Sequence, residues 1–400
     1  MNDSQQNLSF ERLAKWVQPW LFARRYPDLR VLIDPKTRGI LKDLKDSPVI
    51  ICPNHSRHED GELIFLFSIL TKQPVKFLAA REMFRSYLGF GGVVLRALGC
   101  YEVDRGATNT NAVHSIQQRL VDESSKVVIF PEGEISYDND HVENFEHGAA
   151  AIGLESTVLL HEQGRDDDLF LLPVAISYRF DDARAVCLKI LDELERETQL
   201  PVNQTSVYWR ARRVCELYLD SLRQTMKLSS NSDSVQSIDA HVTEIIDTSL
   251  RTLAQELNCQ LPPTTPLHQI HFLQSRIFSK RKQSHFSEKG QLDKLYAETL
   301  NLVRLRSISA EKFEENYSLN SLADLLSNLQ VLILRKQTRV PQHVLISACE
   351  PIRCRDFFED FRIDRDKTTE SVTNLLANSI QKRLNHLRSN QVSNSDLANA

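Results

Sequence analysis

The feature that most constrains this chain is an alternation of short apolar runs with segments of helical length between residues 49 and 177. The runs have the length of single strands: Val49–Cys52, Val75–Leu78, Val127–Phe130 and Leu169–Ser177. Strands that alternate with helices in this way build a sheet whose two faces are both covered. We therefore predict an α/β fold with a central mixed sheet covered by helices.

Beyond Asp181 the sequence changes to a helical pattern. Apolar residues recur at steps of three and four over residues 238–257 and again over 319–332, as they do on one face of an amphipathic helix. The polar stretch 229–234 is typical of a linker. This part of the chain is therefore expected to be all helical.

A strand-like run returns at Val344–Ser347 and is followed by a helical pattern from about Lys367 to Leu387. The alternating domain is therefore expected to resume after the helices. We predict one α/β domain made of residues 1–182 and 340–390, with a large helical insertion, residues 183–339, before the last strand.

Charge and cysteine content narrow the functional classes. The net charge is −4, whereas a nucleic-acid binder normally carries a basic excess. The seven cysteines are scattered and form no C-x-x-C pair, so neither a disulfide framework nor a zinc ribbon is indicated. The first nine residues lack the apolar core of a signal peptide, and no apolar run reaches the length of a membrane span. We expect a cytoplasmic protein that binds no nucleic acid.

Residues 10–25 mix aromatic and basic side chains, including Trp16 and Trp20. This composition suits a lipid interface, and it suits equally a helix that packs on its own domain. Pro19 is expected to interrupt the helix. The membrane surface is therefore one expected partner, with the protein peripheral on the membrane.

The segment Asn54-His55-Ser56-Arg57-His58-Glu59-Asp60 follows directly on the first apolar run. On a regular helix, His55 and Asp60 would be rotated by roughly 140° from each other and could not meet. They can meet if His55 lies in a turn and Asp60 in the first turn of the next helix. The carboxylate would then fix one imidazole nitrogen and leave the other to take a proton. His55 and Asp60 are therefore the predicted catalytic residues.

The same H-x4-D spacing occurs a second time, at His161 and Asp166, so spacing alone is poor support for a functional pair. Only the first pair lies between a strand and an apolar helix, and His161 is expected in an exposed polar loop. A metal site at His55, His58 and Asp60 is an alternative, but H-x2-H-x-D matches no zinc signature and no Cys/His cluster follows it. We expect no metal and no other cofactor.

Four patterns occur in a fixed order along the chain, and together they resemble a known family. They are N-H-x4-D at residues 54–60, G-x5-R at 99–105, Phe-Pro-Glu-Gly-Glu-Ile-Ser at 130–136 and Leu-Pro-Val-Ala-Ile at 172–176. The chain resembles the glycerolipid acyltransferase family, which includes the lysophosphatidic acid acyltransferases. Glu350-Pro351-Ile352 resembles the family's element after its last strand, so the resemblance covers roughly residues 10–180 and 340–387.

The resemblance implies transfer of a fatty acyl group from a thioester donor, acyl-CoA or acyl carrier protein, to a hydroxyl of a lysophospholipid or glycerol-phosphate-type acceptor. His55 would act as the general base and Asp60 would orient it. Backbone N–H groups around Glu132 and Gly133 would stabilise the oxyanion. Arg105 would bind the acceptor phosphate through its planar guanidinium.

Two alternatives stay open. Arg105 could instead pair with Asp104 or Glu102. The protein could also be a catalytically inactive member of the fold that binds lipid or a partner.

The chain departs from the family pattern after F-P-E-G, where Glu134-Ile135 replaces Thr-Arg. A carboxylate near a phosphate is unfavourable unless a cation offsets it. Arg57, Arg81 or Arg85 could supply that cation. The departure bears on which acceptor is used and leaves the transfer chemistry unchanged.

Overall fold

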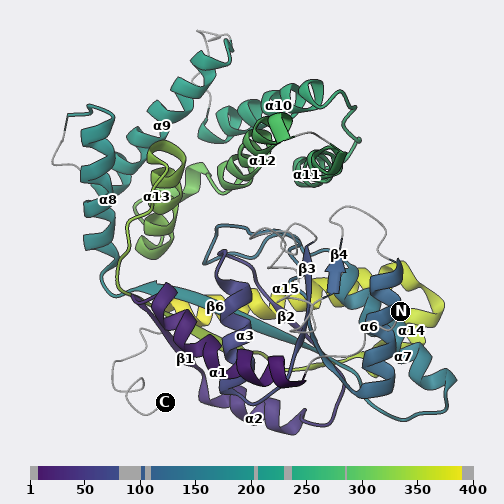
Figure 1. Cartoon of the computed structure of the whole chain (residues 1–400). Helices are drawn as coiled ribbons and strands as arrows, with labels where there is room; N and C mark the ends of the chain where they lie inside the picture. Colours follow the sequence, from purple (N-terminus) through teal and green to yellow (C-terminus); the bar gives the residue numbers. More distant parts are fainter. Residues whose placement is uncertain are drawn as a thin grey trace. The chain divides into compact units, whose positions relative to one another are not determined.

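The computed structural model describes residues 8–80, 101–103, 110–201, 206–228, 237–283 and 286–389. The chain forms two compact units, an α/β unit and a helical unit (Figure 1). The α/β unit consists of Met1–Ile135, Asn139–Tyr178 and Gln342–Ala400, and the helical unit of Ser136–Asp138 and Arg179–Pro341. We propose accordingly that residues 183–339 are a helical insertion in an α/β domain of residues 1–182 and 340–390.

The α/β unit is built on a single sheet, which confirms the predicted fold class. Its strands run in the order β1-β7-β6-β2-β5-β3-β4, and β8 pairs antiparallel with β6. The pairs β1/β7, β2/β5, β2/β6, β3/β4 and β3/β5 are parallel, so the sheet is mixed. The strands are β1 Leu29–Ile33, β2 Val49–Pro53, β3 Lys76–Ala80, β4 Tyr101–Val103, β5 Lys126–Val128, β6 Phe170–Phe180, β7 Gln342–Ala348 and β8 Ile352–Arg353.

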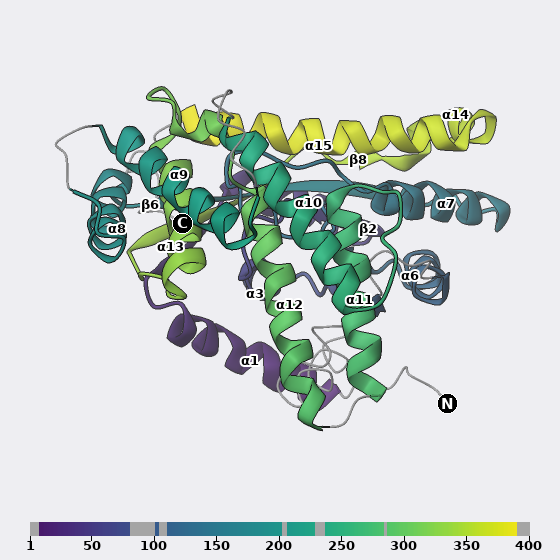
Figure 2. The same ribbon diagram turned by 90° about the horizontal axis from the view of Figure 1, so that it is seen from above.

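Helices cover both faces of this sheet. Side chains of β2 alternate between the faces: Val49 and Ile51 pack with α1, α2 and α3, whereas Ile50 and Cys52 pack with α6, α7 and α15. The long helix α15 contacts α7 (Figure 2). The helices are α1 Leu8–Arg25, α2 Pro35–Asp43, α3 Asp60–Leu70, α6 Thr110–Glu123, α7 Gly148–Glu162, the short η3 Cys354–Phe357, α14 Phe358–Ile363 and α15 Arg365–Ser389.

Two details of the α/β unit differ from expectation. Helix α1 runs through Pro19, which the sequence analysis expected to break it. Strand β1 was not predicted, and it pairs with β7, so that the strand following the helical unit lies between β1 and β6.

The helical unit contains the helices that the apolar periodicity predicted. Each of its longer helices buries one apolar stripe, as α10 does with Ile245, Leu250 and Leu253. Helices α8 and α9 are joined by a buried, bidentate ion pair in which Arg210 Nη2 lies 2.6 Å from Glu195 Oε2. The elements are α8 Ala183–Glu197, α9 Val207–Thr225, α10 Ile238–Glu256, α11 Pro266–Gln283, α12 Phe286–Arg306, η2 Ala310–Phe313 and α13 Leu319–Leu334.

The predicted linker at 229–234 lies outside the described residues. Among the residues that the structure describes, no helix combines the length and the apolar composition needed to cross a bilayer.

Candidate active site

The loop between β2 and α3 is anchored to the sheet by a buried asparagine. Asn54 Oδ1 accepts a hydrogen bond from Ile176 N at 2.7 Å, and its Nδ2 donates to Ile176 O at 3.1 Å. The side chain thus pairs with β6 much as a further strand residue would. Because β2 is parallel to both β5 and β6, the residue that follows Asn54 lies at the carboxyl edge of the sheet, where functional loops of α/β folds gather.

His55 and Asp60 meet across this loop. His55 Nδ1 lies 3.0 Å from Asp60 Oδ2. Asp60 is the first residue of α3, so its carboxylate lies at the positive end of the helix dipole. The Asp60 side chain is fully buried, whereas 14% of the His55 side chain is exposed. With Nδ1 facing the carboxylate, Nε2 on the opposite side of the ring points away from Asp60, as a general base requires.

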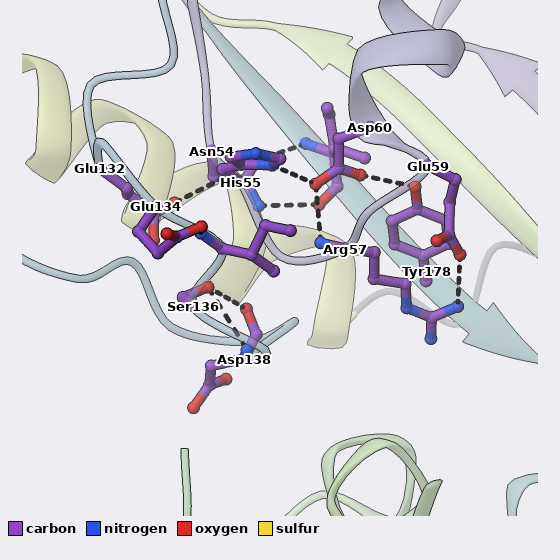
Figure 3. Close-up of polar contacts among 12 residues, drawn as sticks. Asn54, His55, Arg57, Glu59, Asp60, Glu132, Glu134, Ser136, Asp138 and Tyr178 are labelled. Carbon is purple, nitrogen blue, oxygen red and sulfur yellow. Dashed lines mark hydrogen bonds and ion pairs between the residues drawn. The ribbon is translucent and has the colours of Figure 1, made fainter. Parts of the chain in front are cut away.

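The Asp60 carboxylate accepts two more hydrogen bonds (Figure 3). Arg57 N–H donates to Oδ2 at 2.8 Å, and the Tyr178 hydroxyl donates to Oδ1 at 2.6 Å. A buried carboxylate is expensive unless its oxygens are paired, and here both oxygens have donors. Asp60 is therefore held in one orientation by groups from its own loop and from β6.

Glu132 of the F-P-E-G segment connects the two motifs. Its Oε1 accepts a hydrogen bond from His55 N at 2.6 Å, and its Oε2 accepts one from Glu143 N at 3.3 Å. The side chain is buried. In this structure Glu132 thus contributes a carboxylate that fixes the backbone of His55, a contact that the sequence did not reveal.

Gly133 forms the turn that aims Glu132. Its φ of +70° lies in the left-handed region that glycine adopts without strain. Its N–H donates to Phe130 O at 3.1 Å. The predicted oxyanion role of this N–H stays a prediction, and it would require the bond to Phe130 to open.

Glu134 and Ile135, which depart from the family pattern, are both buried within the α/β unit. Glu134 Oε1 accepts a hydrogen bond from Ile135 N at 2.9 Å. The next three residues are held by the helical unit, where Lys312 Nζ lies 2.6 Å from Asp138 Oδ2 and the Arg304 guanidinium lies 4.4 Å from the Tyr137 ring centre.

Of the proposed cations, Arg57 is the one that the structure describes. Its Nη1 donates to Gln342 Oε1 at 2.6 Å and lies 3.8 Å from Glu59 Oε1, and its guanidinium lies 4.0 Å from the Tyr178 ring centre. Arg81, Arg85 and Arg105 lie outside the described residues, as do Asp104 and most of the G-x5-R segment. The phosphate-binding role of Arg105 therefore stays a prediction.

Burial shapes the electrostatics around the pair. Burial, reinforced by the charge of Asp60, raises the pKa of the Tyr178 phenol well above its usual value. Burial also raises the pKa of the Glu59 carboxyl, although the neighbouring Arg57 partly offsets this. Tyr178 therefore stays protonated, and its hydroxyl donates to the Asp60 carboxylate.

Tyr178 is the site residue that the sequence analysis missed. It lies on β6 two positions after the Leu-Pro-Val-Ala-Ile segment, on the same face as Val174 and Ile176. The available signal was a tyrosine on the apolar face of a strand, because a buried phenol normally requires a hydrogen-bond partner. Within the described residues, no group of three or more His, Cys, Asp or Glu side chains is arranged to hold a metal, and His58 is exposed.

A carboxylate-held histidine at the carboxyl edge of a mixed α/β sheet defines a class of site suited to general base catalysis. Residues 36–177, which include β2, β5 and most of β6, match the model of the Acyltransferase family. This match confirms the predicted resemblance to acyltransferases over that part of the chain, and it supports acyl transfer to a lipid-type acceptor. A search of curated proteins gave no match.

Proposed function

We propose that this protein is an O-acyltransferase that moves a fatty acyl group from acyl-CoA or acyl carrier protein to a hydroxyl of a lysophospholipid or glycerol-phosphate-type acceptor. The observation that carries the proposal is the 3.0 Å contact between His55 Nδ1 and Asp60 Oδ2 at the carboxyl edge of the sheet. The family match over residues 36–177 supports the reaction class.

The proposed reaction uses His55 as the base. As the acceptor oxygen attacks the thioester carbonyl, its proton passes to His55 Nε2, and Asp60 stabilises the imidazolium that forms. The C–S bond then breaks, and the leaving thiolate takes the proton from the imidazolium. Glu132 holds the backbone of His55 throughout this cycle, so the ring keeps its place while its charge changes.

The test is transfer by the purified chain from labelled acyl-CoA and labelled acyl carrier protein to lysophospholipids that differ in head group, and to glycerol 3-phosphate. Product is expected, and His55→Ala should lower kcat/KM by about 10²–10⁴-fold because it removes the base. His161→Ala is the matched control, because His161 is exposed in the other H-x4-D segment. A lack of turnover with every donor and acceptor would favour an inactive lipid-binding protein of the same fold.

We also propose that α1 contacts the membrane surface, and that the protein is cytoplasmic and peripheral on the membrane. Trp20 and Leu21 are 60% and 51% exposed, although Phe22 beside them is buried in the core. The Arg24 guanidinium lies 5.5 Å from the Trp20 ring centre, a pairing of aromatic and basic groups that suits a lipid headgroup region.

Sedimentation with anionic liposomes tests this contact. Trp20→Ala should reduce the bound fraction. Trp209→Ala is the matched control, because Trp209 is 44% exposed on α9 of the helical unit and has Arg213 at 5.4 Å in the same i, i+4 relation. An equal effect of the two substitutions would argue against a specific role for α1.

A further inference from the structure

Tyr178 of β6 reaches Asp60 with a polar group. It is fully buried, and its hydroxyl donates to Asp60 Oδ1 at 2.6 Å. A phenylalanine would fill the same space and provide the same apolar area. The hydroxyl therefore distinguishes Tyr178 from an ordinary core residue, and its single described acceptor is the carboxylate of the candidate active site.

The tyrosine is itself held in place from several directions. The side chain of Asn139 bonds to both backbone groups of Tyr178, accepting from its N–H and donating to its C=O, each at 2.7 Å. The Arg57 guanidinium covers the ring at 4.0 Å. A donor fixed in this way can fix its acceptor in turn.

The three groups that contact the Asp60 carboxylate are divided between its two oxygens. Oδ2 faces His55 Nδ1 and Arg57 N–H, whereas Oδ1 faces the Tyr178 hydroxyl (Figure 3). The hydroxyl prevents the carboxylate from rotating away from His55, and it withdraws part of the negative charge that would otherwise attract a proton to the pair.

We propose that Tyr178 is a positioning residue of the candidate active site, whose hydroxyl orients Asp60 toward His55 and lowers the proton affinity of the His55–Asp60 pair. The kinetic part of this inference rests on the proposed acyl transfer. The part that concerns proton affinity does not, because it can be measured without turnover.

The sign of the effect follows from the charge on Asp60. Without the hydroxyl, the carboxylate keeps its full charge and the His55–Asp60 pair holds its proton more tightly. The general base must be unprotonated to act, so the acidic limb of the kcat/KM profile should move to higher pH. A purely structural role in packing would leave this limb in place.

The central variant is Tyr178→Phe. We expect kcat to fall by about tenfold, the effect of losing one hydrogen bond to a charged group, with KM within about twofold. Tyr208→Phe is the matched control, because Tyr208 is a buried tyrosine of the helical unit whose hydroxyl donates to Tyr317 O at 2.6 Å. It should lose a comparable amount of stability and keep the wild-type kcat and pH profile.

Two further measurements keep the inference testable. The ring protons of His55, assigned by comparison with His55→Ala, can be titrated by NMR in the wild type and in Tyr178→Phe, and the apparent pKa should be higher in the variant. Site-specific 3-fluorotyrosine at position 178, a stronger donor of nearly the same shape, should move the pKa and the acidic limb in the opposite direction, to lower pH.

The outcomes separate the two proposals. An inactive wild type with a shifted His55 titration would overturn the proposed function and support the role of Tyr178. The role of Tyr178 would be overturned if the wild type is active and requires His55, but the wild type, Tyr178→Phe and the fluorotyrosine form all show the same His55 titration and the same pH profile of kcat/KM. If Tyr178→Phe does not fold, the fluorotyrosine form decides.

Discussion

The two H-x4-D segments of this chain have the same spacing and different surroundings. Asp60 is fully buried and contacts the His55 ring, whereas the Asp166 side chain is fully exposed and pairs with Arg355 at 3.4 Å. The His161 ring instead lies 4.6 Å from the Phe358 ring centre. The spacing of a motif therefore does not by itself create a catalytic pair.

The local fold explains the difference. His55 lies in a turn after β2, and Asp60 begins α3, so the chain reverses between them. His161 lies in the last turn of α7, where the sequence analysis expected a loop, and Gly164 then turns the chain away with a φ of +67°. The first histidine precedes a helix and the second ends one, and only the first arrangement returns a carboxylate to the ring.

The largest expected effect comes from replacing the aspartate of each H-x4-D segment by asparagine, in two separate variants. Asp60→Asn should lower kcat by about 10²–10⁴-fold, because the amide cannot stabilise the imidazolium and can favour the wrong tautomer. Asp166→Asn should leave kcat within about twofold, because surface substitutions away from special features have small effects. Steady-state kinetics with the best donor and acceptor checks both variants, and equal losses would contradict the comparison.

A third aspartate, Asp34, also lies where a strand leads into a helix, but the partners of its carboxylate are a backbone N–H, a hydroxyl and an arginine. It caps α2 after β1, accepts hydrogen bonds from Lys36 N and the Ser347 hydroxyl, and pairs with Arg383. Burial alone would raise the pKa of Asp34, but the bonds from Ser347 and Lys36 and the charge of Arg383 outweigh it and lower the pKa below its usual value.

Asp34→Asn should therefore cost stability and leave the chemistry intact. Because the folded-state pKa is depressed, the stabilisation is present above the ordinary aspartate pKa of about 3.9 and is lost as the pH falls through the folded-state value. Because asparagine can still cap the helix, the expected decrease of about 1–3 kcal/mol in the free energy of unfolding at pH 7 is due to the lost negative charge. Urea unfolding at pH 7 and near pH 3 measures it, and a loss that does not shrink in acid would refute this account.

The smallest effects are expected at two glycines with left-handed backbone. Gly133→Ala and Gly164→Ala should each lower the free energy of unfolding by about 1–2 kcal/mol. Only Gly133→Ala should also reduce kcat, because its turn aims the Glu132 carboxylate at His55 N and a Cβ there would lie 3.4 Å from Glu146 Cγ. Thermal unfolding and kinetics of both variants test this, and a reduced kcat in Gly164→Ala would count against it.

The fold was largely accessible from the sequence because its central strands are buried on both faces. Strands such as β2 and β6 read as continuous apolar runs. Strand β1 was missed because it lies at the end of the sheet, and of its five residues only Ile33 is buried, while Arg30 is exposed. An edge strand carries less of the apolar signal from which strands are predicted.

The site was accessible only in part, for a different reason. The contact of His55 with Asp60 depends on a turn between neighbouring segments, and strand ends and helix starts can be read locally. The contact of Tyr178 with Asp60 depends on the register of β2 against β6, in which Pro53 pairs with Val174. No local pattern encodes a register between segments more than a hundred residues apart.

The position of β7 has a consequence for how the protein is made. Leu29 of β1 pairs with Gln342 of β7, so at 5–20 residues per second the ribosome needs roughly 15–60 s between making one strand and the other. During that interval the helical segment is synthesised, while the side of β6 that β7 will occupy has no strand beside it. A nascent chain stalled before residue 342 would therefore present an unpaired strand edge, to which strands of other chains can pair.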